Sequence, residues 1–171
     1  MKKYFTYSFI ALLLGVTSYN LYPEKQLPND AVIDAILVLK SERTLQVFSE
    51  GQLLKTYTIS LGRNPFGDKA YEGDQRTPEG IYSINAKNPN SSYHKNLGIS
   101  YPDSCDIVQA NALGKPTGGD IKLHGIRNGA GFIGKFQQFW DWTAGCIALR
   151  NAEIDEIYEH TAIGTRIEIK P

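Results

Sequence analysis

The chain has 171 residues, of which 42% are hydrophobic, and its 18 basic side chains balance 18 acidic ones. This length suits one domain of ordinary size, and the apolar content is too high for a disordered chain. Because no surplus of positive charge is present to neutralise phosphates, we do not expect nucleic acid to be a partner.

The N-terminal segment has the composition of an export signal. Two lysines precede an uncharged, mostly apolar run over residues 5–16, and a polar stretch with two prolines follows. The run is shorter than the ~18 residues of a full membrane span. We therefore predict that residues 1–18 form a signal peptide or an N-terminal membrane anchor and that residues 19–30 form a linker. The protein is expected in the periplasm or cell envelope, with anchoring to the inner membrane left open.

Residues 31–61 have the pattern of β-structure. Three apolar or alternating runs, 36–39, 44–48 and 53–61, are separated by two short turns. This spacing predicts an antiparallel meander. The turn-rich stretch 62–80 is predicted to be a loop, and a loop of this length in a compact domain usually has a function.

Further strands are predicted at 81–84, 121–124 and 166–169, with a polar loop over 85–104. The strand at 121–124 ends on a histidine. Together with the meander, these strands predict a mostly β domain over residues 31–171 with one or two short helices.

The clearest helix is predicted to start at Asn151, a residue type that favours the N-cap position. Acidic residues follow in the first turns, where they suit the positive end of the helix dipole. One apolar face repeats at i, i+3 and i+4, formed by Ile154, Ile157 and Tyr158.

Cys105 and Cys146 are the two cysteines of the chain. In an oxidising compartment a pair of cysteines first suggests a disulfide, which would make the domain a binding module without catalysis. A metal site that adds His94 and His124 is a further alternative, but the spacings match no standard zinc pattern.

A third interpretation makes Cys146 a nucleophile. Gly145 removes a side chain just before the sulfur, so that a substrate carbonyl can approach the backbone and the Gly145 and Cys146 amides can face an oxyanion. A thiol needs a base nearby, and His124 can supply it if the fold brings the two together.

These segments together resemble the L,D-transpeptidase catalytic domain, the YkuD-like family. The resemblance rests on Leu-His-Gly at 123–125, Thr-x-Gly-Cys-Ile-x-Leu at 143–149 and Thr-Pro-x-Gly-x-Tyr at 77–82, and it covers roughly residues 36–169. It implies a β-sandwich with the cysteine and the histidine in a long catalytic cleft.

The resemblance also implies a cysteine acyltransferase that needs no metal or organic cofactor. His124 takes the Cys146 proton, and the Gly125 carbonyl orients the imidazole. The thiolate attacks a peptidoglycan stem peptide at the L-centre of a diamino acid, D-alanine leaves, and the side-chain amine of a second stem forms a 3→3 cross-link. Two other acceptors stay open: water, which gives an L,D-carboxypeptidase or hydrolase, and an amine of an envelope protein.

Two residues beside the nucleophile depart from the family pattern. Ala144 stands where the family usually has a histidine, and Ala148 stands where it usually has an arginine. Arg150 and Arg127 are close in the sequence and are expected to replace that arginine in substrate binding.

An aromatic stretch precedes the nucleophile: Phe136, Phe139, Trp140 and Trp142. These side chains either pack in the core or form a wall or lid of the cleft. Trp142 and Thr143, which are nearest to the nucleophile, are expected to contact the substrate.

Overall fold

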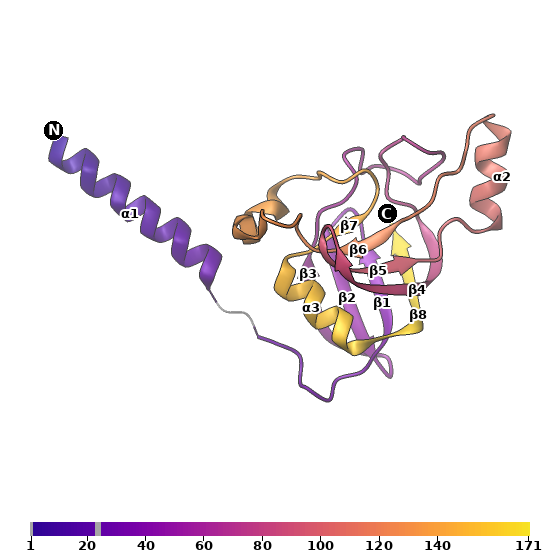
Figure 1. Ribbon diagram of the computed structural model, residues 1–171, viewed down its shortest axis with the longest axis horizontal. Helices are drawn as coiled ribbons and strands as arrows, with labels where there is room; N and C mark the ends of the chain where they lie inside the picture. The colour runs from indigo at the N-terminus through magenta and orange to yellow at the C-terminus, as the bar shows by residue number, and fades with distance from the viewer. Residues whose placement is uncertain (1, 23–24) are drawn as a thin grey trace.

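The computed structural model describes residues 2–22 and 25–171 (Figure 1), and these ranges contain eight strands and four helices. In chain order the elements are α1 (Lys2–Leu21), β1 (Ile33–Leu39), β2 (Thr44–Ser49), β3 (Gln52–Thr58), β4 (Gly80–Ser91), β5 (His94–Ile99), α2 (Ser104–Ala112), β6 (Lys122–His124), the 3₁₀ helix η1 (Gly131–Phe139), β7 (Ile147–Ala148), α3 (Asn151–His160) and β8 (Thr161–Lys170). The mostly β class is confirmed, with more helices than the one or two expected.

The eight strands form one sheet in the order β3-β2-β1-β8-β4-β5-β6-β7. Strands β1, β2 and β3 make the predicted antiparallel meander. Strand β4 belongs to both halves of the sheet, because its first residues pair with β8 and its later residues pair with β5. Just after β3, Ser60 pairs with Ala148 of β7, so the two edges of the sheet meet and the sheet curls onto itself.

The core lies inside this curled sheet and beneath α3. Alternate side chains of the strands point inward, as the period of a half-buried strand requires. The predicted apolar face of α3 packs against the curled sheet, with Ile154 and Ile157 fully buried. Fully burying such a side chain contributes about 1.5–3 kcal/mol. Strand members of the core include Val38, Leu45, Val47, Ile84, Leu97, Leu123, Ile147 and Ile167.

The predicted loop over 85–104 is wrong. Strand β4 continues to Ser91, the chain turns, and β5 runs back beside it, while α2 starts at Ser104. The tip of this hairpin is exposed, so its strand positions carry polar residues and no apolar alternation. Long-range pairing here overrides the low β-propensity of the sequence.

Helix α3 starts at Asn151 as predicted, but its N-cap is Arg150. The Arg150 amide donates to the Glu153 carboxylate at 2.9 Å, which fills the cap. The Asn151 carboxamide instead accepts a hydrogen bond from the Ile126 amide at 2.8 Å. Asn151 therefore ties the chain just after β6 to α3.

Helix α1 projects from the domain, and its last turn contacts η1 (Figure 1). Asn20 donates to the Phe132 carbonyl at 3.1 Å and accepts from the Lys135 amide at 2.8 Å. No helix in the described ranges combines the length and the apolarity that a membrane crossing requires. Residues 1 and 23–24 of the predicted signal and linker lie outside the described residues.

Leu27 already packs into the core, and its amide donates to the Glu156 carboxylate. The folded part of the chain therefore includes residues before position 31, where the sequence pattern places the start of the domain.

Candidate active site

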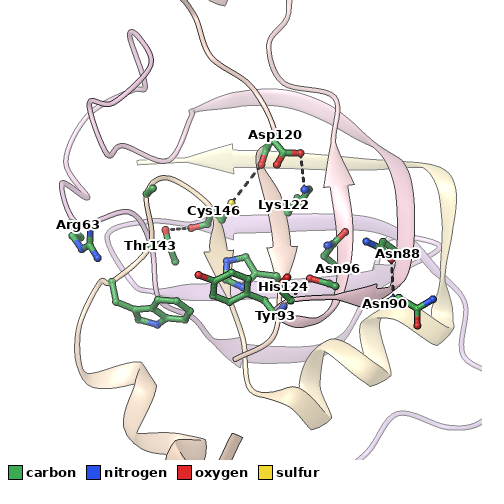
Figure 2. A pocket seen from close by; sticks show the side chains of 14 residues that line it. Arg63, Asn88, Asn90, Tyr93, Asn96, Asp120, Lys122, His124, Thr143 and Cys146 are labelled. Atoms are coloured by element: carbon green, nitrogen blue, oxygen red, sulfur yellow. Dashed lines mark hydrogen bonds and ion pairs between the residues drawn. The ribbon is translucent and has the colours of Figure 1, made fainter. Parts of the chain in front are cut away.

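A cleft of about 580 Å³ opens beside β6 and β7. Its walls come from the loop after β3, the β4–β5 hairpin, β6 with the turn before it, and the segment that leads into β7 (Figure 2). The lining residues are Arg63, Asn88, Asn90, Ser91, Ser92, Tyr93, Asn96, Asp120, Lys122, His124, Trp142, Thr143, Ala144 and Cys146.

The sheet sets the lateral order of the cleft floor. Asn88 pairs with Asn96, Asn96 pairs with His124, and His124 pairs with Ala148, across β4, β5, β6 and β7. Paired residues of neighbouring strands present their side chains on the same face of a sheet. Cys146 lies two positions before Ala148 and so faces the same side. The fold thus brings the predicted nucleophile and the predicted base to one cleft.

The Cys146 thiol is partly exposed at the cleft floor. Its sulfur lies 3.6 Å from the Asp120 carbonyl, to which it donates (Figure 2). Among the residues that the structure describes, no hydrogen bond joins this sulfur to the His124 imidazole. Burial raises the pKa of the thiol, and the Asp120 charge adds to this, while the amide and charge of Lys122 oppose it. The resting sulfur is therefore protonated at neutral pH.

The His124 imidazole is buried, with 6% of the residue exposed. Its Nδ1 lies 2.7 Å from the Gly125 carbonyl oxygen, and since a carbonyl only accepts, Nδ1 carries the hydrogen. The unprotonated Nε2 is then the atom that can accept a proton. The ring packs against Tyr93 and Trp142, at centroid distances of 4.9 and 5.6 Å. Burial lowers the pKa of His124, against the opposing effect of the Gly125 hydrogen bond, so the ring is neutral near pH 7.

Gly145 occupies a position that other residues fit poorly. Its φ is +137°, and a Cβ there would lie 2.7 Å from the Arg76 carbonyl oxygen. Its amide donates to the Thr143 hydroxyl at 3.1 Å, and that hydroxyl donates to the Cys146 carbonyl at 2.7 Å. The Gly145 amide is therefore engaged and does not face the cleft as an oxyanion donor, contrary to the expectation from the sequence. The Cys146 amide makes no hydrogen bond within the described part of the chain.

The loop over 62–79 is tightly held despite its polar sequence. The buried Lys40 ammonium donates to the carbonyls of Gly67 and Thr77 and to the Glu79 carboxylate, at 2.6–2.9 Å. The Thr77 hydroxyl in turn accepts from the Gly62 amide at 3.1 Å. This network fixes the loop against the residue that follows β1, and the Arg63 amide, which donates to the Thr143 carbonyl at 3.1 Å, joins the loop to the segment that leads to Cys146.

Among the residues that the structure describes, neither of the two predicted substrate-binding arginines lines the cleft. The Arg150 guanidinium lies 2.7 Å from Glu153 within α3, and Arg127 is exposed on the turn after β6. Arg63 does line the cleft, although it is far from Cys146 in the sequence. Proximity in sequence was a poor guide here because the cleft is assembled by long-range strand pairing.

Trp142 and Thr143 line the cleft, where the sequence analysis places substrate contacts. The indole Nε1 of Trp142 donates to the buried Gln137 carboxamide at 2.8 Å, which fixes the ring beside His124. Phe139 and Trp140 are exposed and lie neither in the core nor in the cleft lining.

Both cysteines are free thiols. Cys105 is exposed on α2, which Figure 1 shows well apart from β7. A Cys105–Cys146 disulfide is therefore not part of this fold. Within residues 2–22 and 25–171, no group of three His, Cys, Asp or Glu side chains is placed to hold a metal ion.

Comparison with known proteins identifies the family that this chain matches. The family model for the YkuD L,D-transpeptidase catalytic domain matches residues 33–169. A relative from Escherichia coli (strain K12), named "Putative L,D-transpeptidase YafK", is 30% identical over 132 residues. That match covers 72% of this chain and 45% of the relative, so the chain spans about half the length of this curated protein.

Two solved structures are similar to the fold. Pgp2 from Campylobacter jejuni, a helical cell shape determining protein, superposes with a TM-score of 0.61 at 25% identity and covers 90% of this chain and 53% of its own. An L,D-transpeptidase from Xylanimonas cellulosilytica DSM 15894 superposes with a TM-score of 0.53 at 13% identity, covering 86% of this chain and 65% of its own. The second likeness is one of fold alone.

Proposed function

The chain belongs to the L,D-transpeptidase catalytic domain family, and we propose that it transfers the acyl group of a peptidoglycan stem peptide through a thioester on Cys146. One observation carries this proposal: Cys146 and His124 share a single cleft, and the Gly125 carbonyl holds the imidazole with Nε2 unprotonated. A cysteine with a correctly oriented neutral base is the minimum that nucleophilic acyl transfer needs.

In the first half-reaction, Nε2 of His124 accepts the thiol proton as the sulfur attacks the carbonyl carbon at the L-centre of the diamino acid. A C–S bond forms, and the carbonyl oxygen becomes an oxyanion, for which the Cys146 amide is the proposed donor. The C–N bond to the terminal D-amino acid then breaks. Its nitrogen takes the proton from His124, so the D-amino acid leaves as a neutral amine and the thioester remains.

In the second half-reaction, the side-chain amine of another stem peptide attacks the thioester. His124 takes a proton from the amine and returns one to the departing sulfur, which regenerates the thiol and leaves a new amide between the two stems. Such a reaction requires access to the cell wall, and we propose that residues 1–18 direct the export of the chain, which the Lys-Lys start and apolar run support.

The test is product analysis on the purified full-length chain with disaccharide-tetrapeptides. We expect release of D-alanine together with cross-linked dimers, both lost in Cys146→Ala and His124→Ala while circular dichroism stays unchanged. Cys105→Ala, which changes the exposed thiol of α2, is the matched control and should keep full activity. Turnover by folded Cys146→Ala would reject the mechanism, and trimmed monomers without dimers would assign water as the acceptor instead of an amine.

A further inference from the structure

The cleft is chemically asymmetric along its length. Figure 2 shows Arg63 on one side of Cys146, and Asn88 and Asn90 on the other side, beyond His124. The hairpin wall is neutral, because its lining residues are asparagines, serines and a tyrosine. A substrate with a charged end therefore meets different chemistry at the two ends of the cleft.

Arg63 is the charged group that distinguishes the two ends. Lys122 also faces the cleft, but its ammonium lies 2.6 Å from the Asp120 carboxylate. Of the cleft-lining cations in the described residues, only Arg63 has no ion-pair or side-chain hydrogen-bond partner. Its side chain is exposed to the cleft opening, where a guanidinium can take a carboxylate in two parallel hydrogen bonds.

The backbone of Arg63 is fixed relative to the nucleophile. Its amide donates to the Thr143 carbonyl at 3.1 Å, and the Thr143 amide donates to the Leu61 carbonyl at 3.1 Å. The Thr143 hydroxyl also donates to the Cys146 carbonyl at 2.7 Å. A short chain of hydrogen bonds thus connects the backbone of Arg63 to that of Cys146, so the spacing between guanidinium and sulfur varies only through these two side chains.

The opposite wall offers hydrogen bonds without charge. Asn96 is 5% exposed, lies beside His124 in the strand register, and lines the cleft with no side-chain hydrogen bond in the described structure. Its carboxamide is not among the polar groups that are sealed from solvent, so a ligand in the cleft can take up its hydrogen bonds. A carboxamide suits the amide groups of a peptide backbone, because it can donate and accept at once.

We propose that Arg63 binds the free terminal carboxylate of the leaving D-amino acid, while Asn96 and the hairpin wall hold the amides of the acyl donor. This inference rests on the proposed function, because it names the substrate end that each wall of that same site recognises. It makes Arg63 the residue that selects peptides with an uncapped C-terminus.

The experiment measures binding to full-length Cys146→Ala, which cannot turn over. Two ligands are compared by calorimetry: a stem tetrapeptide that ends in D-alanine, and the same peptide as its C-terminal carboxamide. Hydrogen bonds to a charged group at a partly exposed site predict about tenfold tighter binding of the free acid. Adding Arg63→Gln should reduce this preference to less than about twofold, and Arg63→Lys should keep part of it.

Arg127→Gln is the matched control, since it removes an exposed arginine that does not line the cleft. It should leave the preference for the acid unchanged, and thermal unfolding should show that all variants are folded. A preference that survives Arg63→Gln, equal binding of acid and amide, or no binding of either peptide would overturn the inference. If the acid preference depends on Arg63 but the chain with Cys146 restored releases no D-alanine, the proposed function fails while the role of Arg63 stands.

Discussion

Replacing Thr143 by valine tests how the nucleophile segment is held in place. The buried Thr143 hydroxyl accepts from the Gly145 amide at 3.1 Å and donates to the Cys146 carbonyl at 2.7 Å. Valine has nearly the same shape, so the substitution removes both hydrogen bonds without opening a cavity. Each lost bond costs about 0.5–1.5 kcal/mol, and the Gly145 amide is left buried and unsatisfied, so the total is about 2–4 kcal/mol.

The matched control is Thr161→Val, because the Thr161 hydroxyl is also buried but has no hydrogen-bond partner. Its removal should leave stability unchanged or raise it slightly. In thermal unfolding of the full chain, 2–4 kcal/mol corresponds to a drop of roughly 5–15 °C for Thr143→Val. Acylation of Cys146 should slow at least tenfold, since small displacements of a nucleophile are costly. Equal unfolding midpoints for the two variants would refute the assigned role of the Thr143 hydroxyl.

Three further outcomes are expected. The acylation rate, measured against pH, should stay flat through neutral and mildly alkaline pH and fall only in acid, because burial lowers the pKa of His124 and raises the pKa of Cys146. A rate that changes steeply across the neutral range would contradict this. Gly125→Ala should lower the acylation rate, because a Cβ there would lie 2.8 Å from the Asn151 carboxamide oxygen and would displace the Gly125 carbonyl that orients the His124 imidazole. Unchanged kinetics would argue against that orienting role. Glu156→Ala should destabilise the fold by about 2–4 kcal/mol in urea unfolding, because Lys55 and Tyr57 of β3 lose the carboxylate to which both donate. Glu159→Ala, on the exposed side of the same helix, should change the stability by less than about 0.5 kcal/mol.

The sequence predicts those elements whose pattern is local. The meander alternates because one face of each strand is buried, and α3 repeats its apolar residues with the period of a helix. The strand predicted at 121–124 is found as β6, with Leu123 fully buried, whereas the two-residue strand β7 is too short to show a pattern and was not predicted.

The parts that could not be predicted depend on long-range pairing. The β4–β5 hairpin is polar on its exposed tip, so nothing in its sequence distinguishes it from a loop. A start signal for α2 was present, since Asp103 and Asp106 form a capping box, but the short helix has little apolar pattern behind it. Arg63 and Asn96 join the cleft only because distant segments pair beside the nucleophile, and no local pattern reveals this.

The neutral state of the Cys146 and His124 pair has a consequence if the chain works as the proposed exported enzyme. A thiolate is the form of cysteine that oxidants and disulfides attack, and the proposed export would place this chain in an oxidising compartment. Burial disfavours the charged form of both groups, so the thiolate forms only as the sulfur attacks its substrate. A charge-separated resting pair would be faster to acylate but also faster to oxidise. The flat pH profile expected above is the signature of the protected arrangement, because a resting ion pair would lose activity as pH rises through the pKa of a charged imidazole.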